Sequence, residues 1–385
     1  MQVQVEPEMA LEPHEVARLP SAWAMSLVMA VCVLVWAANV YTGMDFMKPK
    51  PEDLYRWGGN ASSAVQAGEW WRLLTNIFLH GGAIHLTMNM FALWESGLIL
   101  TRLFGNRGFL FVYFCSGIVG SALSLFFAAQ THVAVGASGA IFGVMGALLV
   151  AVMRHQDRMP AAYSKRLKTG LGVFIVLSLL FGFIQPGIDN AAHIGGLLAG
   201  MLCGLVVTAP AGTHSSSGGR NLRLLGGTVV FGAIVMAMVQ FSPPAKHDMR
   251  VIFHDMQAWA DLQPQFIAYQ KALLVDVASM QSGKISPQQF SRLLYEKHIP
   301  AIRQIEIGLA RLRLPEDEFS GRAVKAQRLF LDASIKWFAA VLLYDAERSQ
   351  LAKLRMQEQE ALFQQRVAEM KALNDAINAA AKKSG

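Results

Sequence analysis

The chain has 385 residues, of which 53% are hydrophobic and only 16% are charged, and its formal net charge is +7. Soluble globular domains carry about 25% charged residues, so the composition excludes an ordinary soluble protein and favours one that spans a membrane. The positive charge does not indicate nucleic-acid binding. In the apolar part of the chain, the Lys and Arg residues fall mainly in the connections between apolar stretches.

The apolar residues are concentrated in the first 242 positions, where seven stretches could cross a bilayer. A spanning helix needs roughly 20 apolar residues. The fourth to sixth stretches are a little short, which suits helices with one end beneath a polar cavity, because irregular backbone at membrane depth is tolerated there. The predicted fold class is therefore an all-α polytopic membrane protein. The stretches cover about 22–42, 82–101, 108–129, 137–153, 170–186, 191–208 and 223–242.

The distribution of basic residues predicts the orientation of these helices. Five Lys and Arg residues between Arg154 and Lys168 occupy the connection between the fourth and fifth stretches, whereas 130–136 and 185–190 carry none. Basic connections stay in the cytoplasm, so we expect the N-terminus inside. The long basic loop 43–81 is an exception and must lie outside. Everything after the seventh helix is then outside as well.

Composition changes divide the chain into five expected segments. A polar, Glu-rich cytoplasmic tail over 1–20 lacks the basic region of a signal peptide. Residues 21–210 contain six spans, 211–222 form a Gly/Ser-rich linker, and 223–242 form the seventh helix. Residues 243–385 are polar, with helical spacing at Leu343, Ala346, Leu351 and Leu354. We expect three or four helices there, with breaks near 282–287, at Pro300 and around 314–321, in a helical bundle or coiled coil outside the membrane.

Three places in the apolar stretches hold polar side chains that hydrocarbon would penalise, and one of them is Ser138, in VGASGAIFG. Small residues allow helices to approach closely, so Ser138 alone could be a packing residue. His193, in AHIGG, is harder to explain, because an ionisable residue inside a membrane is a functional hypothesis by default. Gly196, Gly200 and Gly204 follow it on one helix face. If this face packs on the helix that begins at Ser138, the hydroxyl and the imidazole meet as nucleophile and base.

His85 and Asn89, in HGGAIHLTMN, share a helix face because they are four residues apart. Both side chains can donate hydrogen bonds to the oxyanion of a tetrahedral intermediate. The alternative is that they hold helices together. The predicted orientation places both, with Ser138 and His193, near the outer ends of their helices. The Ser138 amide lies in a first helical turn, where backbone N–H groups are unpaired, and it could join the oxyanion site.

In combination and order, these motifs resemble the rhomboid family of intramembrane serine proteases over roughly 20–210. GASG at 136–139, AHIGG, HxxxN, and the Trp71–Arg72 pair carry the resemblance. It implies a six-helix core and a catalytic dyad of Ser138 and His193. It also implies an oxyanion site from His85, Asn89 and the Ser138 amide.

The resemblance further implies supporting residues. Gly136 belongs to the GASG motif, and Trp71 and Arg72 would hold the 43–81 loop partly in the outer leaflet. Phe142 stands where some relatives have a Tyr beneath the catalytic imidazole, and His80 would be structural. A Glu that some relatives carry near the inner end of the second span is Thr101 here, and Glu95 could replace it.

The expected function is that of a serine endopeptidase that cleaves single-pass transmembrane substrates without metal or cofactor. Its partners would be those substrates, the lipid bilayer and an unknown protein that binds 243–385. A bacterial cytoplasmic membrane is the expected location. Asp189, four residues before His193, suggests a triad, but the family works as a dyad. Two rivals are an inactive relative that binds transmembrane clients and a transporter. The transporter would need charges deep in the spans, where the sequence offers only Glu95.

Overall fold

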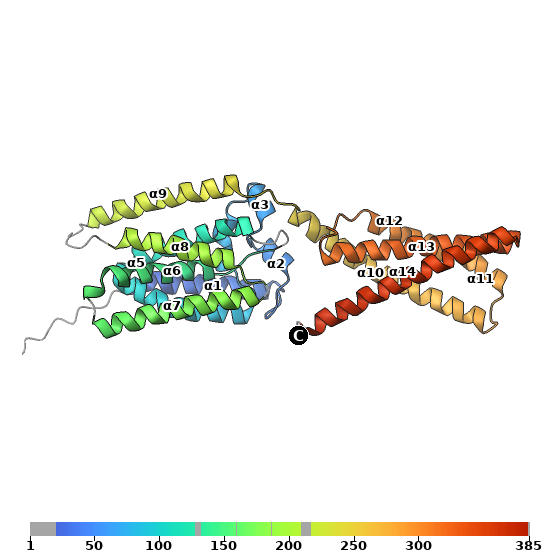
Figure 1. Cartoon of the computed structure of the whole chain (residues 1–385), viewed down its shortest axis with the longest axis horizontal. Coiled ribbons are helices and arrows are strands. Elements are labelled where there is room, and N and C mark those ends of the chain that lie inside the picture. Colours follow the sequence, from blue (N-terminus) through green and yellow to red (C-terminus); the bar gives the residue numbers. More distant parts are fainter. Residues whose placement is uncertain (1–20, 128–131, 159, 186, 209–216, 384–385) are drawn as a thin grey trace, which may run out of the picture. The chain divides into compact units, whose positions relative to one another are not determined.

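A computed structural model describes residues 21–127, 132–158, 160–185, 187–208 and 217–383. Within these ranges the chain is helical and forms no strand, apart from one isolated bridge between Asn60 and Ala134. The chain divides into two compact units, 1–246 and 247–385 (Figure 1). The expected tail 1–20 and the first half of the expected linker, residues 211–216, lie outside the described residues.

Apolar helices make up most of the first unit. Five of them, α1, α5, α7, α8 and α9, are long and apolar enough to cross a membrane, and α6 is a shorter apolar helix of 17 residues. The first unit is thus the multi-pass integral membrane part that the composition predicts. The helix bounds are Trp23–Tyr41 for α1, Ala83–Phe127 for α5, Ser138–Arg154 for α6, Ala161–Ile184 for α7, Asn190–Val207 for α8 and Ser217–Phe241 for α9.

Helix α5 contains both the second and the third expected spans. They are two helices that meet at a kink, where only Gly105 leaves helical geometry, with φ 72° and ψ 174°, so the connection between the spans is shorter than the six residues expected. Glycine reaches this positive φ without steric cost, so a single residue redirects the chain. Arg102 and Arg107 therefore lie on helical turns beside the kink.

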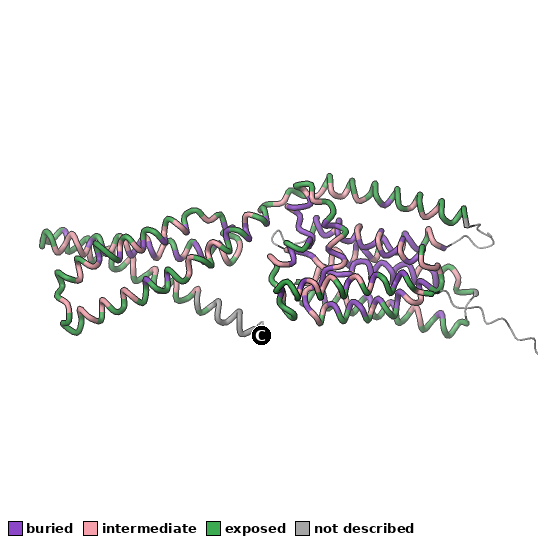
Figure 2. The backbone as a smooth tube through the Cα atoms, turned by 180° about the vertical axis from the view of Figure 1, so that it is seen from behind, coloured by how far each residue is buried: buried purple, intermediate pink, exposed green. Residues whose placement is uncertain are grey.

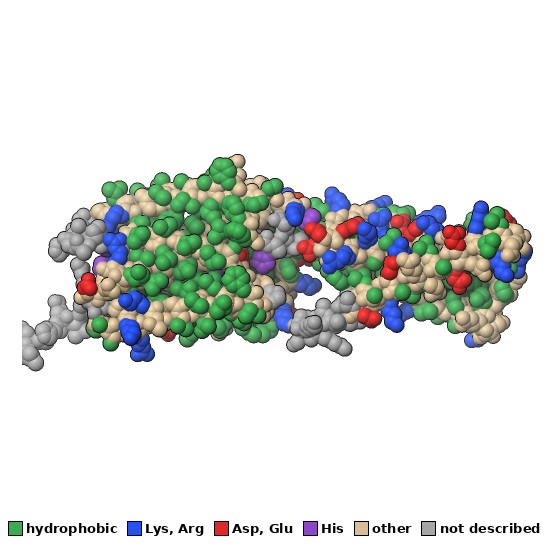
Figure 3. All heavy atoms as spheres, in the orientation of Figure 1, with side chains coloured by type: hydrophobic (Ala, Val, Ile, Leu, Met, Phe, Trp, Pro, Cys, Tyr) green, Lys and Arg blue, Asp and Glu red, His purple; other side chains and the backbone are tan. Residues whose placement is uncertain are grey.

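Two helices begin earlier than expected. Helix α7 starts at Ala161 instead of about 170, and α9 at Ser217 instead of 223. Lys165, Arg166 and Lys168 therefore lie on the first turns of a helix, since Lys and Arg are good helix formers. In Figure 3 blue side chains gather at the end of the first unit where α7 and α9 begin, beside a surface covered by apolar side chains.

The centre of the first unit is built from the second half of α5 together with α6 and α8. Its buried residues include Phe109, Tyr113, Val144 and Leu148. Figure 2 shows buried backbone concentrated in these inner helices, whereas α7 and α9 are mostly exposed along their length. An exposed apolar helix is expected where lipid, rather than protein, is the neighbour.

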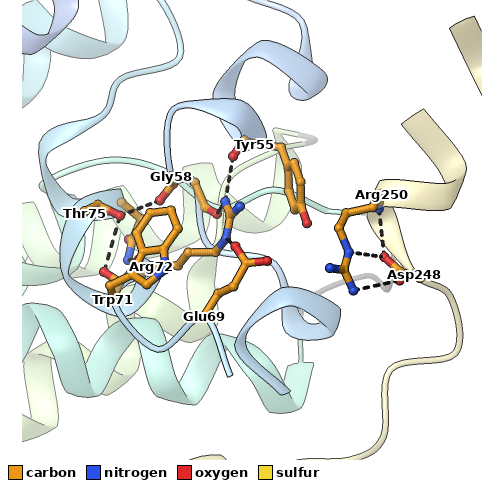
Figure 4. A network of polar contacts seen from close by, with 10 residues as sticks. Tyr55, Gly58, Glu69, Trp71, Arg72, Thr75, Asp248 and Arg250 are labelled. Carbon is orange, nitrogen blue, oxygen red and sulfur yellow. Dashed lines mark hydrogen bonds and ion pairs between the residues drawn. The ribbon is translucent and has the colours of Figure 1, made fainter. Parts of the chain in front are cut away.

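The long connection before α5 is a folded element. It contains the short helices α2 (Pro51–Arg56), α3 (Ser62–Gln66) and α4 (Arg72–Thr75) and the 3₁₀ turn η1 (Asn76–Phe78). The buried Arg72 holds it together, because Nη1 donates to Tyr55 O at 2.6 Å and Gly59 O at 2.9 Å, and Nε donates to Glu69 at 2.7 Å (Figure 4). Its guanidinium also stacks on the Tyr55 and Trp71 rings, at 4.1 and 4.7 Å.

Gln66 joins this connection to the C-terminal end of α9. Its Nε2 donates to Ser242 Oγ at 2.9 Å and to Pro243 O at 2.6 Å, and its Oε1 accepts from Ala245 N at 2.8 Å. One side chain thus satisfies three groups that follow α9, more than 170 residues away in sequence. These contacts lie within the first unit.

The second unit is entirely helical where it is described. Its elements are α10 (Met249–Gln281), α11 (Pro287–Leu293), the π-helical turn η3 (Leu294–His298), α12 (Ile299–Ala310), α13 (Phe319–Glu347) and α14 (Gln350–Lys383). Breaks near 282–287 and 314–321 are present as expected. At Pro300 the chain changes from the π-helical turn η3 to α12 without an intervening loop, and the proline lies in the first turn of α12, where no intrahelical N–H is needed.

One break in the second unit escaped the sequence analysis. Arg348 adopts a left-handed conformation, φ 52°, and ends α13. The helical spacing read across 343–354 therefore belongs to two helices. Nothing in the composition around Arg348 signals this end, since neither Gly nor Pro stands there.

Candidate active site

Ser138 is the first residue of α6, at the end of a short irregular segment that is fixed on both sides. Asn60 and Ala134 exchange backbone hydrogen bonds of 2.9 and 2.8 Å, and Gly136 N donates to Asn76 O at 2.9 Å. Gly136 has φ +128°, a conformation that favours glycine. The folded connection before α5 therefore positions the segment that leads into Ser138.

His193 lies in the first turn of α8 and faces Ser138. Its Nε2 is 2.8 Å from Ser138 Oγ, and the side chain is 8% exposed. The hydrogen bond expected from the glycine pattern is therefore present. A serine hydroxyl that donates to an unprotonated imidazole nitrogen has the arrangement of a nucleophile with its base.

Glycines allow α6 and α8 to pack closely enough for the Ser138–His193 hydrogen bond. A Cβ atom added to Gly196 would lie 2.0 Å from Gly139 O, and one added to Gly200 would lie 2.0 Å from Gly143 O. Since ordinary contacts of a Cβ atom begin at 3.4 Å, a side chain does not fit at either position. The prediction that the glycine face of the His193 helix packs on the helix that begins at Ser138 is confirmed.

Phe142 supports the imidazole from one side. The ring centroids of Phe142 and His193 are 4.5 Å apart, and the planes differ by 8°. Phe142 lies one turn after Ser138 on the same helix, so α6 carries both the hydroxyl and the ring that orients its partner. The contact expected at this position is present, and it needs no hydroxyl on the ring.

Asp189 does not complete a triad in this structure. Its Oδ1 accepts from Ala192 N at 2.9 Å as the N-cap of α8, and its Oδ2 accepts from Ser124 Oγ. His193 Nδ1 is buried and has no hydrogen-bond partner among the described residues. Asp189 thus fixes the start of the helix that carries His193 but makes no hydrogen bond to the imidazole. The dyad arrangement fits this geometry better than the triad.

His85 lies on the other side of Ser138, in the first turn of α5. Its Nδ1 accepts a hydrogen bond from Gly81 N at 3.1 Å. A backbone N–H can only donate, so Nδ1 carries no proton and the neutral ring is protonated at Nε2. His80 packs edge-on against this ring, with centroids 5.3 Å apart, which fits the structural role expected for it.

The space between His85 and Ser138 is kept open by Gly136. A Cβ atom added there would lie 2.9 Å from His85 Nε2 and 3.7 Å from Ser138 Oγ. One point is therefore close to a ring N–H and to the hydroxyl. A substrate carbonyl oxygen could accept a hydrogen bond there while its carbon faces Ser138 Oγ.

Two further donors were expected at this point. Asn89 is buried on the same face as His85, and its Nδ2 donates to His85 O at 2.9 Å. That bond uses one of its two amide protons and leaves the other. The Ser138 amide precedes the first hydrogen bond of α6, which runs from Ile141 N to Ala137 O. The Ser138 N–H therefore takes no part in the backbone hydrogen bonds of the helix.

The remaining sequence-predicted residues lie away from the dyad. Trp71 is half exposed and Arg72 is buried in the folded connection, where their contacts fit a supporting role. Thr101 is buried, and its hydroxyl has no partner among the described residues. Glu95 is exposed, so it does not replace the missing contact. No cluster of metal-binding side chains occurs in the described ranges.

Several polar contacts around the site were not expected from the sequence. Ser121 Oγ and Asn76 Nδ2 are 2.9 Å apart, and Asn60 Nδ2 donates to Ser121 O. These bonds fasten the folded connection to the second half of α5. Ser and Asn inside apolar stretches were the available signal, but their partners are 45 and 61 residues away, and no local pattern identifies them.

Comparisons with known proteins agree with this geometry. A family model of the Rhomboid domain matches residues 67–210. The chain is 32% identical over 257 residues to Rhomboid protease GluP of Bacillus subtilis (strain 168), which covers 67% of this chain and 46% of the relative. It is 38% identical over 138 residues to Putative rhomboid protease YdcA of the same organism, which covers 36% of this chain and 67% of the relative.

A plant protein shows the same kind of similarity. RHOMBOID-like protein 4 of Arabidopsis thaliana is 37% identical over 161 residues, which covers 41% of this chain and 40% of the relative. The chain thus spans less than half the length of GluP and of this protein. Both catalytic candidates, both expected oxyanion side chains and Trp71–Arg72 fall within the matched domain.

Proposed function

The chain belongs to the rhomboid family, and on that premise we propose that it is an intramembrane serine endopeptidase with a dyad of Ser138 and His193. The observation that carries the proposal is the 2.8 Å contact between Ser138 Oγ and His193 Nε2. Its similarity to GluP and YdcA, which are named as rhomboid proteases, supports protease activity. The position of both side chains in the first turns of apolar helices supports it further.

The proposed reaction begins when His193 Nε2 accepts the proton of Ser138 as Oγ attacks the scissile carbonyl carbon. The tetrahedral intermediate carries its negative charge on the former carbonyl oxygen, where His85 Nε2–H and the Ser138 amide would donate. The imidazolium then gives its proton to the leaving amine. Water attacks the resulting ester with His193 again as the base, and Ser138 is restored.

Asn89 is proposed as a third donor to the oxyanion through its second amide proton. Losing one such donor typically lowers the rate by about 10²–10³-fold. Phe142, Gly136 and Arg72 would act indirectly. Phe142 orients the imidazole, and Gly136 keeps the space for the substrate carbonyl open. Arg72 holds the connection before α5, whose Asn60 and Asn76 position the segment that leads into Ser138.

The proposed substrates are single-pass transmembrane proteins, cut in or near the membrane. Ser138 and His193 lie at the ends of apolar helices, which fits a substrate cut near the membrane surface. A substrate helix would have to unwind locally, because each of its carbonyls accepts a hydrogen bond from the residue four positions later. Following the basic residues, we place the N-terminus in the cytoplasm and the second unit outside, in a bacterial cytoplasmic membrane. That unit would bind a further protein, and residues 21–210, 223–242 and 243–385 would be separate functional segments.

Cleavage of a designed transmembrane substrate by the purified protein in lipid vesicles tests the proposal. We expect the wild type to cut, and Ser138→Ala and His193→Ala to be inactive. Ser178→Ala is the matched control, because Ser178 also lies in an apolar helix, α7, but outside the site. If Ser138→Ala cuts as fast as the wild type, the dyad is refuted. If no variant cuts any of several substrates, the chain is an inactive relative that binds transmembrane clients.

A further inference from the structure

The first half of α5 has an outward face that no described element covers. Ile84, Met88 and Phe91 are 66%, 63% and 64% exposed, and Glu95 is exposed as well. Their spacings of four, three and four residues place all four on one side of the helix. The face begins beside His85, so it runs inward from the candidate active site.

Glu95 lies near the middle of this helix. It is about 18 Å along the axis from Ala83 and about 15 Å from the kink at Gly105, at 1.5 Å per residue. The hydrocarbon layer is about 30 Å thick, so the carboxylate lies near mid-depth. No hydrogen bond or ion pair reaches it from the described residues. Such a group is costly in lipid unless a donor meets it.

The described apolar helices of the first unit do not supply a cation at that depth. The Lys and Arg residues of the apolar helices of the first unit lie near helix ends or beside the Gly105 kink, and α1 and α8 contain none. A second copy would bring the same arrangement, so it offers no opposite charge to Glu95. The complementary group must come from a different transmembrane helix.

We propose that Glu95 recognises a basic side chain in the transmembrane helix of the substrate, which docks along Ile84, Met88 and Phe91. This inference rests on the proposed protease function, because it takes the docked helix to be the one that is cut. His85 lies beside Ser138, and Glu95 follows ten residues later, about 15 Å further in. The basic residue is therefore expected about ten helical residues to the inner side of the scissile bond.

The test measures binding separately from cleavage. The full-length Ser138→Ala protein is reconstituted in phosphatidylcholine vesicles with labelled Leu/Ala transmembrane peptides, and association is followed by energy transfer. One peptide has only apolar residues in its span, and the others carry a single Lys at successive depths. Hydrogen bonds between membrane helices are worth roughly 1–2 kcal/mol in peptides, which corresponds to about 5- to 30-fold in affinity.

We expect the Lys peptide of matching depth to bind about tenfold more tightly than the apolar one, and Glu95→Leu to remove this preference. Asp157→Asn, which removes an exposed carboxylate between α6 and α7, should retain it. The inference is overturned if Glu95→Leu keeps the preference, if depth does not matter, or if neither peptide associates.

A cleavage assay with the wild-type protein distinguishes failure of this inference from failure of the proposed function. If the wild type cuts and the Ser138→Ala protein does not, yet Glu95 has no influence on Lys recognition, only the docking inference fails. If Lys recognition depends on Glu95 but nothing is cut, the docking surface stands and the protease function fails.

Discussion

Replacing Gly196 by Ala tests whether close helix packing sets the geometry of the dyad. The new Cβ atom would lie 2.0 Å from Gly139 O, and this contact is with backbone, which cannot rotate away. To reach an ordinary contact, α6 and α8 must separate by about 1.4 Å. A shift of that size in the direction of the Ser138–His193 bond lengthens it from 2.8 Å to about 4 Å, beyond hydrogen-bonding distance.

The expected cost falls on activity more than on stability. Overpacking costs about 1–3 kcal/mol, and Ala in place of Gly in a helix returns up to about 1 kcal/mol. The net loss of stability is therefore modest. A misplacement of about 1 Å in a catalytic geometry lowers the rate on the order of 10²-fold. We expect Gly196→Ala to fold and to cut about 100-fold more slowly.

The assay is the initial rate of cleavage of a designed transmembrane substrate in vesicles, together with the thermal unfolding midpoint. Gly172→Ala is the matched control, because Gly172 lies in α7 and a Cβ atom there meets nothing within 4 Å. It should cut at the wild-type rate. A Gly196→Ala protein that cuts as fast as Gly172→Ala would refute the reasoning, since the dyad would then tolerate the separation.

Four further outcomes follow from contacts in the structure. Arg72→Lys should lower the thermal midpoint and the cleavage rate, because an ammonium group cannot reach all the acceptors of the guanidinium; an unchanged midpoint contradicts this. Asp189→Asn should keep cleavage within a few-fold, since Asn also caps helices, whereas a 10⁴-fold loss would restore the triad. Phe142→Leu should slow cleavage more than substrate binding, as measured by separate kcat and KM values, and equal effects on both argue against an orienting role. In the second unit, the bond from Lys297 lowers the pKa of Asp276, and burial lowers the pKa of His298. Folded His298 binds fewer protons than the unfolded residue below its usual pKa of 6.5, so stability should fall as the pH drops through 6.5, whereas the stabilisation from Asp276 is lost only below its usual pKa of 3.8. Because of His298, hydrogen exchange in 269–298 of the full chain, corrected for intrinsic rates, should quicken from pH 7 to 5, and slower exchange at pH 5 would reverse the sign.

The helices of the first unit were predictable because hydrocarbon thickness imposes a length on apolar stretches. Their ends were less predictable. Helices such as α7 continue into water over residues that hydropathy assigns to a loop, and Lys165 and Lys168 favour the helix as much as they mark the boundary. The kink at Gly105 could not be distinguished from a short connection, since a single residue with positive φ leaves no periodic trace.

The dyad was predictable for a different reason. Glycines at four-residue spacing after His193 predict a flat face, and a flat face needs a partner of matching shape, which the helix that begins at Ser138 provides. The protonation of His85 and the partners of Asp189 could not be predicted in this way. They depend on Gly81 and Ser124, whose contacts follow from the three-dimensional path of the chain.

The three hydrogen bonds of Gln66 indicate which part of the chain is needed to keep the contacts around the candidate site. The matched family domain ends at 210, yet the connection that positions the Ser138 segment is tied to Ser242, Pro243 and Ala245. A chain cut after 210 would lack all three partners of Gln66. A chain cut after 246 would keep them. The matched family domain and the part of the chain that keeps these hydrogen bonds therefore end at different residues. Helix α9 lies outside the matched domain but inside the part that keeps the bonds.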